Sequence, residues 1–314
     1  MEKRILIAID GSPASLAAVK YMAFVFGKGA HVNIDLLHIL PGMSPLFLEP
    51  GESMEEMTQL QGFARQMGEE NRRKADSLLE EAKTVLVDAG MDPANINTRV
   101  QEASAGVARD ILDLEASGEY DGIVLGRHGM SAVGEFFMGS VSHKVLQHVH
   151  GVPLCIVHNE VESRRILLPI ESAPNSKRAL DHVAWLLTTA GPMEVTILHV
   201  VMPLIPKEAT AMWTGLGDLE STIEQRLLAD AEDMLSQAKT YLLERAVPDI
   251  AITTRLETRA TGVSRAILKE AEEGGYGSIM IGRRGLSRTE RFLFGSVSNK
   301  VVQQAKGMAV WVIC

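Results

Sequence analysis

One segment in the first half of the chain combines glycines, a serine and a predicted helix start in a way that suits a phosphate group. It reads Gly126-x-x-Gly129, then the nine residues Met130–Met138, then Gly139-Ser140. Glycine lets the backbone approach a ligand closely, so that successive N–H groups can point at an anion. A helix start adds unpaired N–H groups and a partial positive charge, and Ser140 adds a hydroxyl donor. The segment therefore predicts an anion site.

The second half of the chain carries the same pattern. It reads Gly282-x-x-Gly285, the nine residues Leu286–Phe294, and Gly295-Ser296. The alternative is that these glycines only end a strand and begin a helix, and for a single copy the two interpretations weigh about evenly. Because both copies keep the nine-residue gap, we favour phosphate binding.

Basic side chains lie inside both glycine pairs. The first pair encloses Arg127 and His128, and the second encloses Arg283 and Arg284. Arginine pairs bidentately with phosphate, so Arg283 and Arg284 are expected to favour a charged ligand. A solvated basic surface is an equally good explanation for two further arginines of the second copy, Arg288 and Arg291.

These matches belong to a duplication of the whole chain of 314 residues. Gly126 and Gly282 are 156 residues apart, whereas Arg4-Ile5-Leu6 recurs 161 residues later as Arg165-Ile166-Leu167. The second copy has therefore lost five residues after its second predicted strand. A repeat of this length is large enough to bury its own core. The expected domains are residues 1–158 and 163–314.

Each half alternates strand and helix patterns. In the first half the predicted strands are 4–10, 31–40, 95–101, 121–125 and 153–158. The predicted helices begin at Pro13, with Ser12 as the capping residue, and at 58, 106 and 139. Such alternation implies a parallel sheet covered on both faces, and in these sheets ligands bind at the carboxyl ends of the strands.

The composition narrows the class of protein. Apolar residues make up 46% of the chain and charged residues 23%, which is typical of a folded globular protein. The net charge of −9 disfavours binding to nucleic acid or to an anionic membrane. No apolar run approaches the ~20 residues that cross a bilayer, and the first apolar stretch is too short for a signal peptide. The two cysteines fit no disulfide framework, so we expect a cytoplasmic protein.

With these motifs, the sequence resembles the universal stress protein family in its tandem form, over essentially the whole chain. Gly-x2-Gly-x9-Gly-Ser/Thr is the signature of the nucleotide-binding members of that family. The resemblance implies two repeated doubly wound α/β domains, each a five-stranded parallel sheet of strand order 3-2-1-4-5 with helices on both faces. It also implies binding of ATP, or of ADP or AMP, with Mg²⁺ on the phosphates.

The resemblance assigns roles to residues of the first half. Asp10, at the end of the first strand, would accept hydrogen bonds from the ribose hydroxyls, and the backbone at Ala8 and Ile39 would flank the adenine. The phosphates would be held by Gly126, Gly129, Gly139, Ser140 and Val141, with Arg127 and His128 beside them.

The second half has matching residues with one important departure. Glu171 stands where the first half has Asp10, while Pro169 is usual for the family where the first half has Ala8. We therefore expect the first site to be more selective for an intact ribose and the second to depend more on phosphate charge. The full set in the second half is Pro169, Glu171, Val200, Gly282, Arg283, Arg284, Gly285, Gly295, Ser296 and Val297.

Other residues favour binding over catalysis. His38 and His199 occupy equivalent strand ends, where a hydrogen-bonded structural residue is a better explanation than a catalytic base. Nothing resembles a nucleophile–base pair with an orienting third group. Four histidines, His143, His148, His150 and His158, lie close together in the sequence. No metal site is predicted from them, because spacings of five and two do not bring His143, His148 and His150 to one helix face.

Two surfaces suit a protein partner. The segments after the second strands are rich in methionine, and either a packed loop or helix face, or a lid or partner surface, explains them. Their apolar residues are Met43, Phe47, Met54, Met57, Met67, Met202, Met212 and Trp213. By the family resemblance, the apolar strands 153–158 and 309–314 would pair the halves as an intramolecular pseudo-dimer, with further assembly into a homo-oligomer.

The expected function is that of an adenine-nucleotide-binding stress-response protein. Nucleotide would act as a switch, or set the affinity for a protein partner that the sequence does not identify. Two alternatives remain open. One is a slow ATPase or phosphotransferase with a metal ion on the phosphates, and the other is a nucleotide-independent scaffold that uses the methionine-rich loops.

Overall fold

The computed structural model describes residues 2–29, 31–40, 42, 54–129, 138–171, 173–202, 217–258, 260–283 and 295–314. For residues 54–57, 173–175 and 217–220 it describes the backbone alone. Several predicted residues lie outside the described residues, namely Met43, Phe47, Met212, Trp213, Arg284, Gly285, Arg288 and Arg291.

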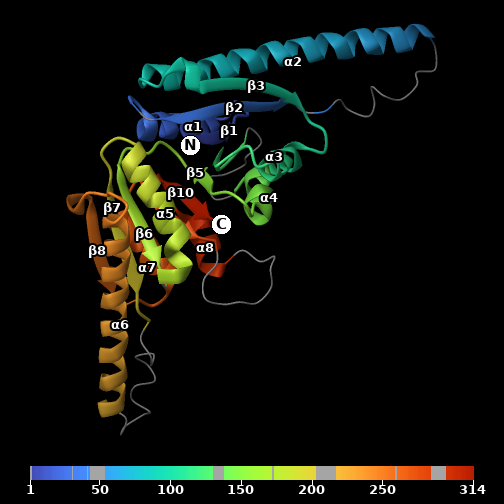
Figure 1. The fold of residues 1–314 in the computed structure, drawn as a ribbon. Helices are drawn as coiled ribbons and strands as arrows, with labels where there is room; N and C mark the ends of the chain where they lie inside the picture. Colours follow the sequence, from blue (N-terminus) through green and yellow to red (C-terminus); the bar gives the residue numbers. More distant parts are fainter. Residues whose placement is uncertain are drawn as a thin grey trace. The chain divides into compact units, whose positions relative to one another are not determined.

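The first of two compact units, Met1–Val152, alternates strands and helices (Figure 1). The central strand β1 pairs in parallel with β2 and β4, and β2 pairs in parallel with β3. The elements are β1 (Lys3–Ala8), α1 (Pro13–Phe26), β2 (Val32–Leu40), α2 (Met54–Asp88), the 3₁₀ helix η2 (Pro93–Asn95), β3 (Ile96–Glu102), α3 (Val107–Ala116), β4 (Gly122–Gly126) and α4 (Ser140–His148).

The second compact unit, Pro153–Cys314, repeats this arrangement and begins with the last strand of the first repeat. Here β6 pairs in parallel with β7 and β9, β7 with β8, and β9 with β10, whereas β5 pairs with β10 antiparallel. The elements are β5 (Leu154–Val157), β6 (Arg165–Ile170), α5 (Ala173–Thr189), β7 (Glu194–Val200), α6 (Gly217–Leu243), η4 (Asp249–Ala251), β8 (Ile252–Glu257), α7 (Val263–Glu273), β9 (Ser278–Gly282), α8 (Ser296–Gln304) and β10 (Ala309–Ile313).

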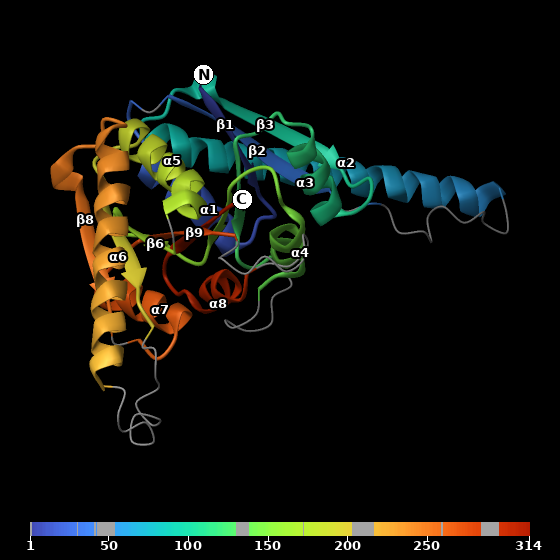
Figure 2. The same cartoon turned by 60° about the horizontal axis from the view of Figure 1, so that its bottom comes forward.

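The strand order confirms the predicted fold class. It reads β3-β2-β1-β4-β5 in the first repeat and β8-β7-β6-β9-β10 in the second, which is the order 3-2-1-4-5 in both. The helices pack in pairs, α1 with α2 and α3 with α4, then α5 with α6 and α7 with α8 (Figure 2). Each repeat is therefore doubly wound, with its strand order reversing beside the first strand.

The core explains why the central strands read as continuous apolar runs. Ile5, Leu6 and Ile7 of β1 are fully buried, and all five residues of β4 are buried too. Strands that are covered on both faces cannot alternate with polar residues, which is the pattern of parallel sheets. Among the described helices, none has the length and apolar character needed to cross a bilayer.

The turn after β1 forms as its residue types predict. The Ser12 side chain accepts a hydrogen bond from the Ser15 N–H (3.2 Å), and Pro13 occupies the first helical turn of α1. Gly11, before the cap, has a φ of +84°, a conformation that favours glycine. This turn fixes where Asp10 leaves the sheet.

Candidate functional site

The site of the first repeat lies at the carboxyl ends of β1 and β4, where the strand order reverses. Asp10 is exposed, and its Oδ1 accepts a hydrogen bond from the Ser12 N–H (3.0 Å). A Cβ atom added to Gly129 would lie 2.6 Å from Asp10 Oδ2. The structure therefore brings the Asp10 carboxylate directly against the first glycine pair. Ala8 and Ile39 lie near the carboxyl ends of the adjacent strands β1 and β2.

The start of α4 folds back onto the same glycine pair. The Gly139 N–H donates to the Arg127 carbonyl (2.8 Å), and a Cβ on Gly139 would lie 3.2 Å from the backbone nitrogen of Gly129. Ser140 is exposed and Val141 half-buried, in the first turn of the helix. A helix start with an exposed hydroxyl thus opens beside the glycines, which is a favourable place for an anion.

Two serines hold these segments together, Ser142, which was not predicted, and Ser12, which was predicted only as a helix cap. The Ser142 hydroxyl donates to the Gly126 carbonyl (2.7 Å), and the Ser12 hydroxyl donates to the His128 carbonyl (3.1 Å). In the second repeat the Ser298 hydroxyl donates to the Gly282 carbonyl, also at 2.7 Å. The repetition of Gly-Ser-Val-Ser in both halves is the signal that identifies Ser142 and Ser298.

Gly126 has a packing role that the motif alone does not reveal. A Cβ atom there would lie 2.5 Å from the Ala14 carbonyl carbon and 2.7 Å from the Ser15 nitrogen, both in the backbone of α1. Backbone atoms inside a helix cannot move aside easily, so the absence of a side chain lets α1 lie against β4. This glycine is explained by packing as well as by a ligand.

The arginines beside the first glycines are buried. Arg127 and Arg283 are 5% and 4% exposed, and burial lowers the pKa of the Arg127 guanidinium. Their backbones serve the two loops in the same way, because the Gly295 N–H donates to the Arg283 carbonyl (3.1 Å) as Gly139 does to Arg127. Arg284, the other arginine behind the expected charge dependence of the second site, lies outside the described residues, so that expectation stays a prediction.

The strand-end histidines hold neighbouring strands together. The Nδ1 atom of His38 lies 2.8 Å from the Ile9 carbonyl oxygen, and His199 Nδ1 lies 2.8 Å from that of Ile170. Because a carbonyl only accepts hydrogen bonds, Nδ1 must be the protonated nitrogen in both rings. This geometry agrees with the structural role expected for these residues.

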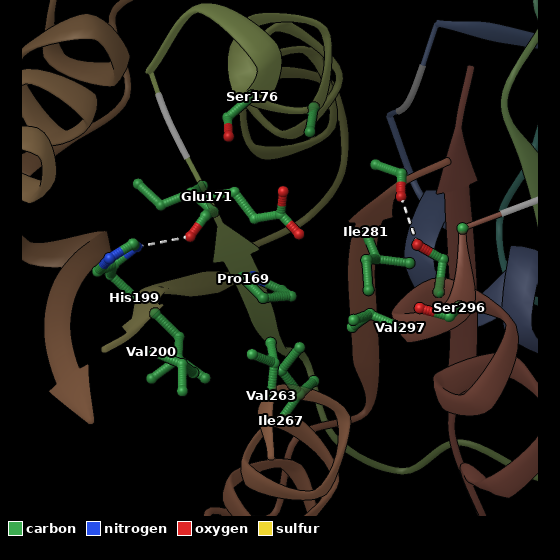
Figure 3. A pocket seen from close by; sticks show the side chains of 16 residues that line it. Pro169, Glu171, Ser176, His199, Val200, Val263, Ile267, Ile281, Ser296 and Val297 are labelled. Carbon is green, nitrogen blue, oxygen red and sulfur yellow. Dashed lines mark hydrogen bonds between the residues drawn. The ribbon is translucent and has the colours of Figure 1, made fainter. Parts of the chain in front are cut away.

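The second repeat contains a cavity of about 360 Å³ at the corresponding place (Figure 3). This volume lies within the range of small-molecule sites, ~300–1,000 Å³. Pro169 and Val200 line it from strand ends, Val263 and Ile267 from α7, and Ser296 and its neighbours from the start of α8. One end of the cavity is therefore apolar, and another offers the backbone and hydroxyl groups of a helix start.

Most residues predicted for the second site line this one cavity. They are Pro169, Glu171, Val200, Gly282, Gly295, Ser296 and Val297. Arg283 is not among the lining residues, and Arg284 and Gly285 lie outside the described residues. Ser176, Val263 and Ile267 also line the cavity and were not predicted, because they come from helices whose facing surfaces depend on tertiary packing.

Comparison with known proteins places the two repeats in one family. The model of the universal stress protein family matches residues 1–158 and again residues 162–313. The chain belongs to the universal stress protein family.

A universal stress protein of Mycolicibacterium smegmatis is 25% identical over 320 residues, covering 97% of this chain and 95% of that protein. Among solved structures, a universal stress protein from Archaeoglobus fulgidus covers 99% of this chain and 97% of its own, with a TM-score of 0.59 and 21% identity. That likeness shows the fold. Another A. fulgidus universal stress protein, solved in complex with dAMP, covers 49% of this chain and 99% of its own, with a TM-score of 0.34 and 19% identity.

The described part of this universal stress protein contains no group of three or more His, Cys, Asp or Glu side chains placed to hold a metal ion. Among the described lining residues of the cavity, Glu171 carries the only carboxylate. Hard cations such as Mg²⁺ take oxygen ligands and commonly reach a protein through substrate phosphates. A metal ion here would need most of its ligands from a bound phosphate chain or from water.

Proposed function

We propose that this universal stress protein binds an adenine nucleotide, as ATP, ADP or AMP, at the carboxyl ends of the strands in both repeats. The observation that carries the proposal is the cavity of the second repeat. It gathers seven of the ten residues predicted for that site, and the others are Arg283, which is buried, and two residues outside the described residues.

The lining residues suit the three parts of a nucleotide. Pro169, Val200 and Ile267 offer an apolar wall to the base, and Glu171 offers acceptor oxygens to the ribose hydroxyls. Phosphates would lie at the start of α8, beside Gly295 and Ser296, where the helix offers N–H groups and a partial positive charge. Mg²⁺ would enter with the phosphates of ATP.

The bound nucleotide would act as a switch that sets the affinity for a protein partner. A ligand can do this only if it binds two conformations with different affinity. We also propose that the protein lies in the cytoplasm and that its two repeats form a pseudo-dimer. The antiparallel pairing of β5 with β10, the last strand of each repeat, supports the pseudo-dimer.

The test introduces one negative charge at the start of α4 or of α8, in separate variants. Ser140→Asp and Ser296→Asp keep a residue type that stabilises the first turn of a helix, but each puts a carboxylate where phosphate would bind. Isothermal titration of the full chain with ATP should give a stoichiometry near two, falling to near one in either variant. Ser140→Asn and Ser296→Asn are the matched neutral controls and should keep two sites. If neither aspartate variant lowers the stoichiometry, ATP does not bind at these helix starts.

Two further measurements separate this function from the alternatives. Sustained release of phosphate from ATP, lost in both aspartate variants, would favour a slow ATPase. Absence of bound nucleotide in the purified protein, together with no heat of ATP binding, would favour a scaffold.

A further inference from the structure

Ser176 of α5 differs from its counterpart Ser15 in what its hydroxyl contacts. The two serines are 161 residues apart, the offset that relates the first strands of the repeats. The Ser15 hydroxyl donates to the Ser12 carbonyl (2.9 Å) and accepts from the Asp10 N–H (3.4 Å), so it is used inside the β1–α1 turn. The Ser176 hydroxyl forms no hydrogen bond with the described part of the chain, although Ser176 is only 8% exposed.

The place of Ser176 explains how a buried hydroxyl can remain without a protein partner. Ser176 and Glu171 both line the cavity of the second repeat, and Figure 3 shows the Ser176 hydroxyl directed toward the strand end that carries Glu171. Most buried polar groups in folded proteins have a hydrogen-bond partner, and a hydroxyl that faces a cavity can find one in water or in a ligand. A ligand in the cavity would take the place of water as the partner of the Ser176 hydroxyl.

The two side chains have complementary hydrogen-bonding chemistry. A carboxylate only accepts hydrogen bonds, whereas a serine hydroxyl both donates and accepts. A ribose diol offers two donors and two acceptor oxygens, so it can donate to Glu171 while accepting from Ser176. A phosphate fits this end of the cavity poorly, because the Glu171 carboxylate would repel it.

We propose that Ser176 contacts the ribose and is a specificity-determining residue of the second site, a role that Ser15 does not share. This inference rests on the proposed nucleotide binding. It also explains how the second site can recognise ribose although it has a glutamate in place of Asp10. The fixed aspartate of the first site would be replaced by a glutamate and a serine hydroxyl acting together.

The experiment measures selectivity in the full chain with the first site disabled by Ser140→Asp. In this background, Ser176→Ala should weaken ATP binding about five- to ten-fold, the loss expected for one neutral hydrogen bond. One of the two analogues, 2′-deoxy-ATP or 3′-deoxy-ATP, lacks the hydroxyl that Ser176 contacts. Ser176→Ala should change the affinity for that analogue by less than about two-fold. Thermal stability without nucleotide should not fall, because the deleted hydroxyl has no partner in the described chain.

Ser15→Ala in the Ser296→Asp background is the matched control. It should lower the unfolding midpoint, since Ser15 makes two backbone hydrogen bonds, and leave the ratio of ATP to deoxy-ATP affinities unchanged. Equal losses for ATP and both deoxy analogues in Ser176→Ala, or no loss at all, would overturn the role of Ser176. Failure of the Ser140→Asp chain to bind any of the three nucleotides would overturn nucleotide binding in the second repeat itself.

Discussion

The loop that follows the fourth strand is built alike in the two repeats, whereas the polar cluster beside the first strand is not. In both loops the glycine before the helix donates to the carbonyl of the buried arginine. In both, the second serine of Gly-Ser-Val-Ser donates at 2.7 Å to the last carbonyl of the strand. These bonds match position by position across the two repeats.

Each repeat has a buried carboxylate that contacts a tyrosine and an arginine, but the carboxylate comes from a strand in the first repeat and from a helix in the second. In the first repeat, buried Asp35 of β2 accepts from Arg4 (2.6 Å), Tyr120 (3.0 Å) and Asn97 (3.0 Å). The residue 161 positions after Asp35 is a threonine. There a carboxylate of α7, Glu270, accepts from Tyr276 (3.2 Å) and pairs with Arg255 (2.9 Å).

This contrast separates two kinds of constraint. A cluster that only stabilises the fold needs a carboxylate near a tyrosine and an arginine, and a strand or a helix can provide it. A site that binds a ligand needs particular backbone groups at particular places, so its hydrogen bonds must be kept in the same positions. The loops follow the second rule, which supports a shared function at the carboxyl ends of the strands.

The largest expected effect is the loss of stability in Gly126→Ala, which tests how far the two loops resemble each other. Gly126→Ala puts a Cβ 2.5 Å from the α1 backbone and should cost about 3 kcal/mol of unfolding free energy, as overpacked cores do. Gly129→Ala would instead meet the end of the Asp10 side chain, which can move, so it should cost less than about 1 kcal/mol while weakening nucleotide binding. Urea denaturation and ATP titration measure the two effects.

The same variant in the second repeat, Gly282→Ala, tests whether the likeness extends to packing. We expect a loss of stability similar to that of Gly126→Ala. If Gly282→Ala is tolerated while Gly126→Ala is not, the two loops share hydrogen bonds but not the close approach of the helix to the strand.

The sequence predicted the features that depend on local patterns. The alternation of strands and helices, the Ser12 cap and the duplication all follow from short segments or from their recurrence, whereas the strand order was expected only from the family resemblance. The Asp35 cluster could not be predicted in this way, because Tyr120 lies 85 residues away in the sequence. The burial of Arg127 and Arg283 could not be predicted either, because arginine is seldom buried and no local pattern indicates it. Ser176 escaped prediction because its importance depends on which hydrogen bonds are absent.

A smaller effect separates the two polar clusters by their response to alkaline pH. Burial, followed by the charge of Asp35, raises the pKa of Tyr120 to about 12, and burial also raises that of Tyr276. The folded state therefore holds the phenolic proton more tightly than the unfolded state does. The stability that results is complete below pH ~10 and is lost as the pH rises from there toward 12.

Unfolding midpoints between pH 9 and 11.5 measure this loss. Tyr120→Phe should cost about 1 kcal/mol at neutral pH, through the lost hydrogen bond to Asp35, and should make the alkaline decline shallower. Tyr276→Phe should reduce the decline less. A Tyr120→Phe chain that declines as steeply as the parent would mean that other groups govern the alkaline loss, and a larger effect of Tyr276→Phe would reverse the order of the two clusters.

The smallest expected effect concerns the carboxylate that follows the first strand of each repeat, Asp10 in one and Glu171 in the other. The Asp10 carboxylate accepts from the Ser12 N–H and lies against Gly129, so its place is fixed by the turn. Asp10→Glu should crowd Gly129 and lower the preference of the first site for ATP over 2′-deoxy-ATP by about three-fold. Glu171→Asp should change that preference in the second site by less than about two-fold, because the Ser176 hydroxyl continues to contact the ribose.

Titrations in the Ser296→Asp and Ser140→Asp backgrounds isolate the two sites for this exchange. The salt dependence of ATP binding is the internal control and should stay the same in both variants, since neither carboxylate contacts the phosphates in the proposed arrangement. Equal and opposite changes in preference would contradict the expectation. They would mean that carboxylate length alone sets ribose selectivity, and that neither the Ser12 turn nor Ser176 contributes. A larger change in Glu171→Asp than in Asp10→Glu would mean that the second carboxylate, rather than the serine beside it, dominates ribose recognition there.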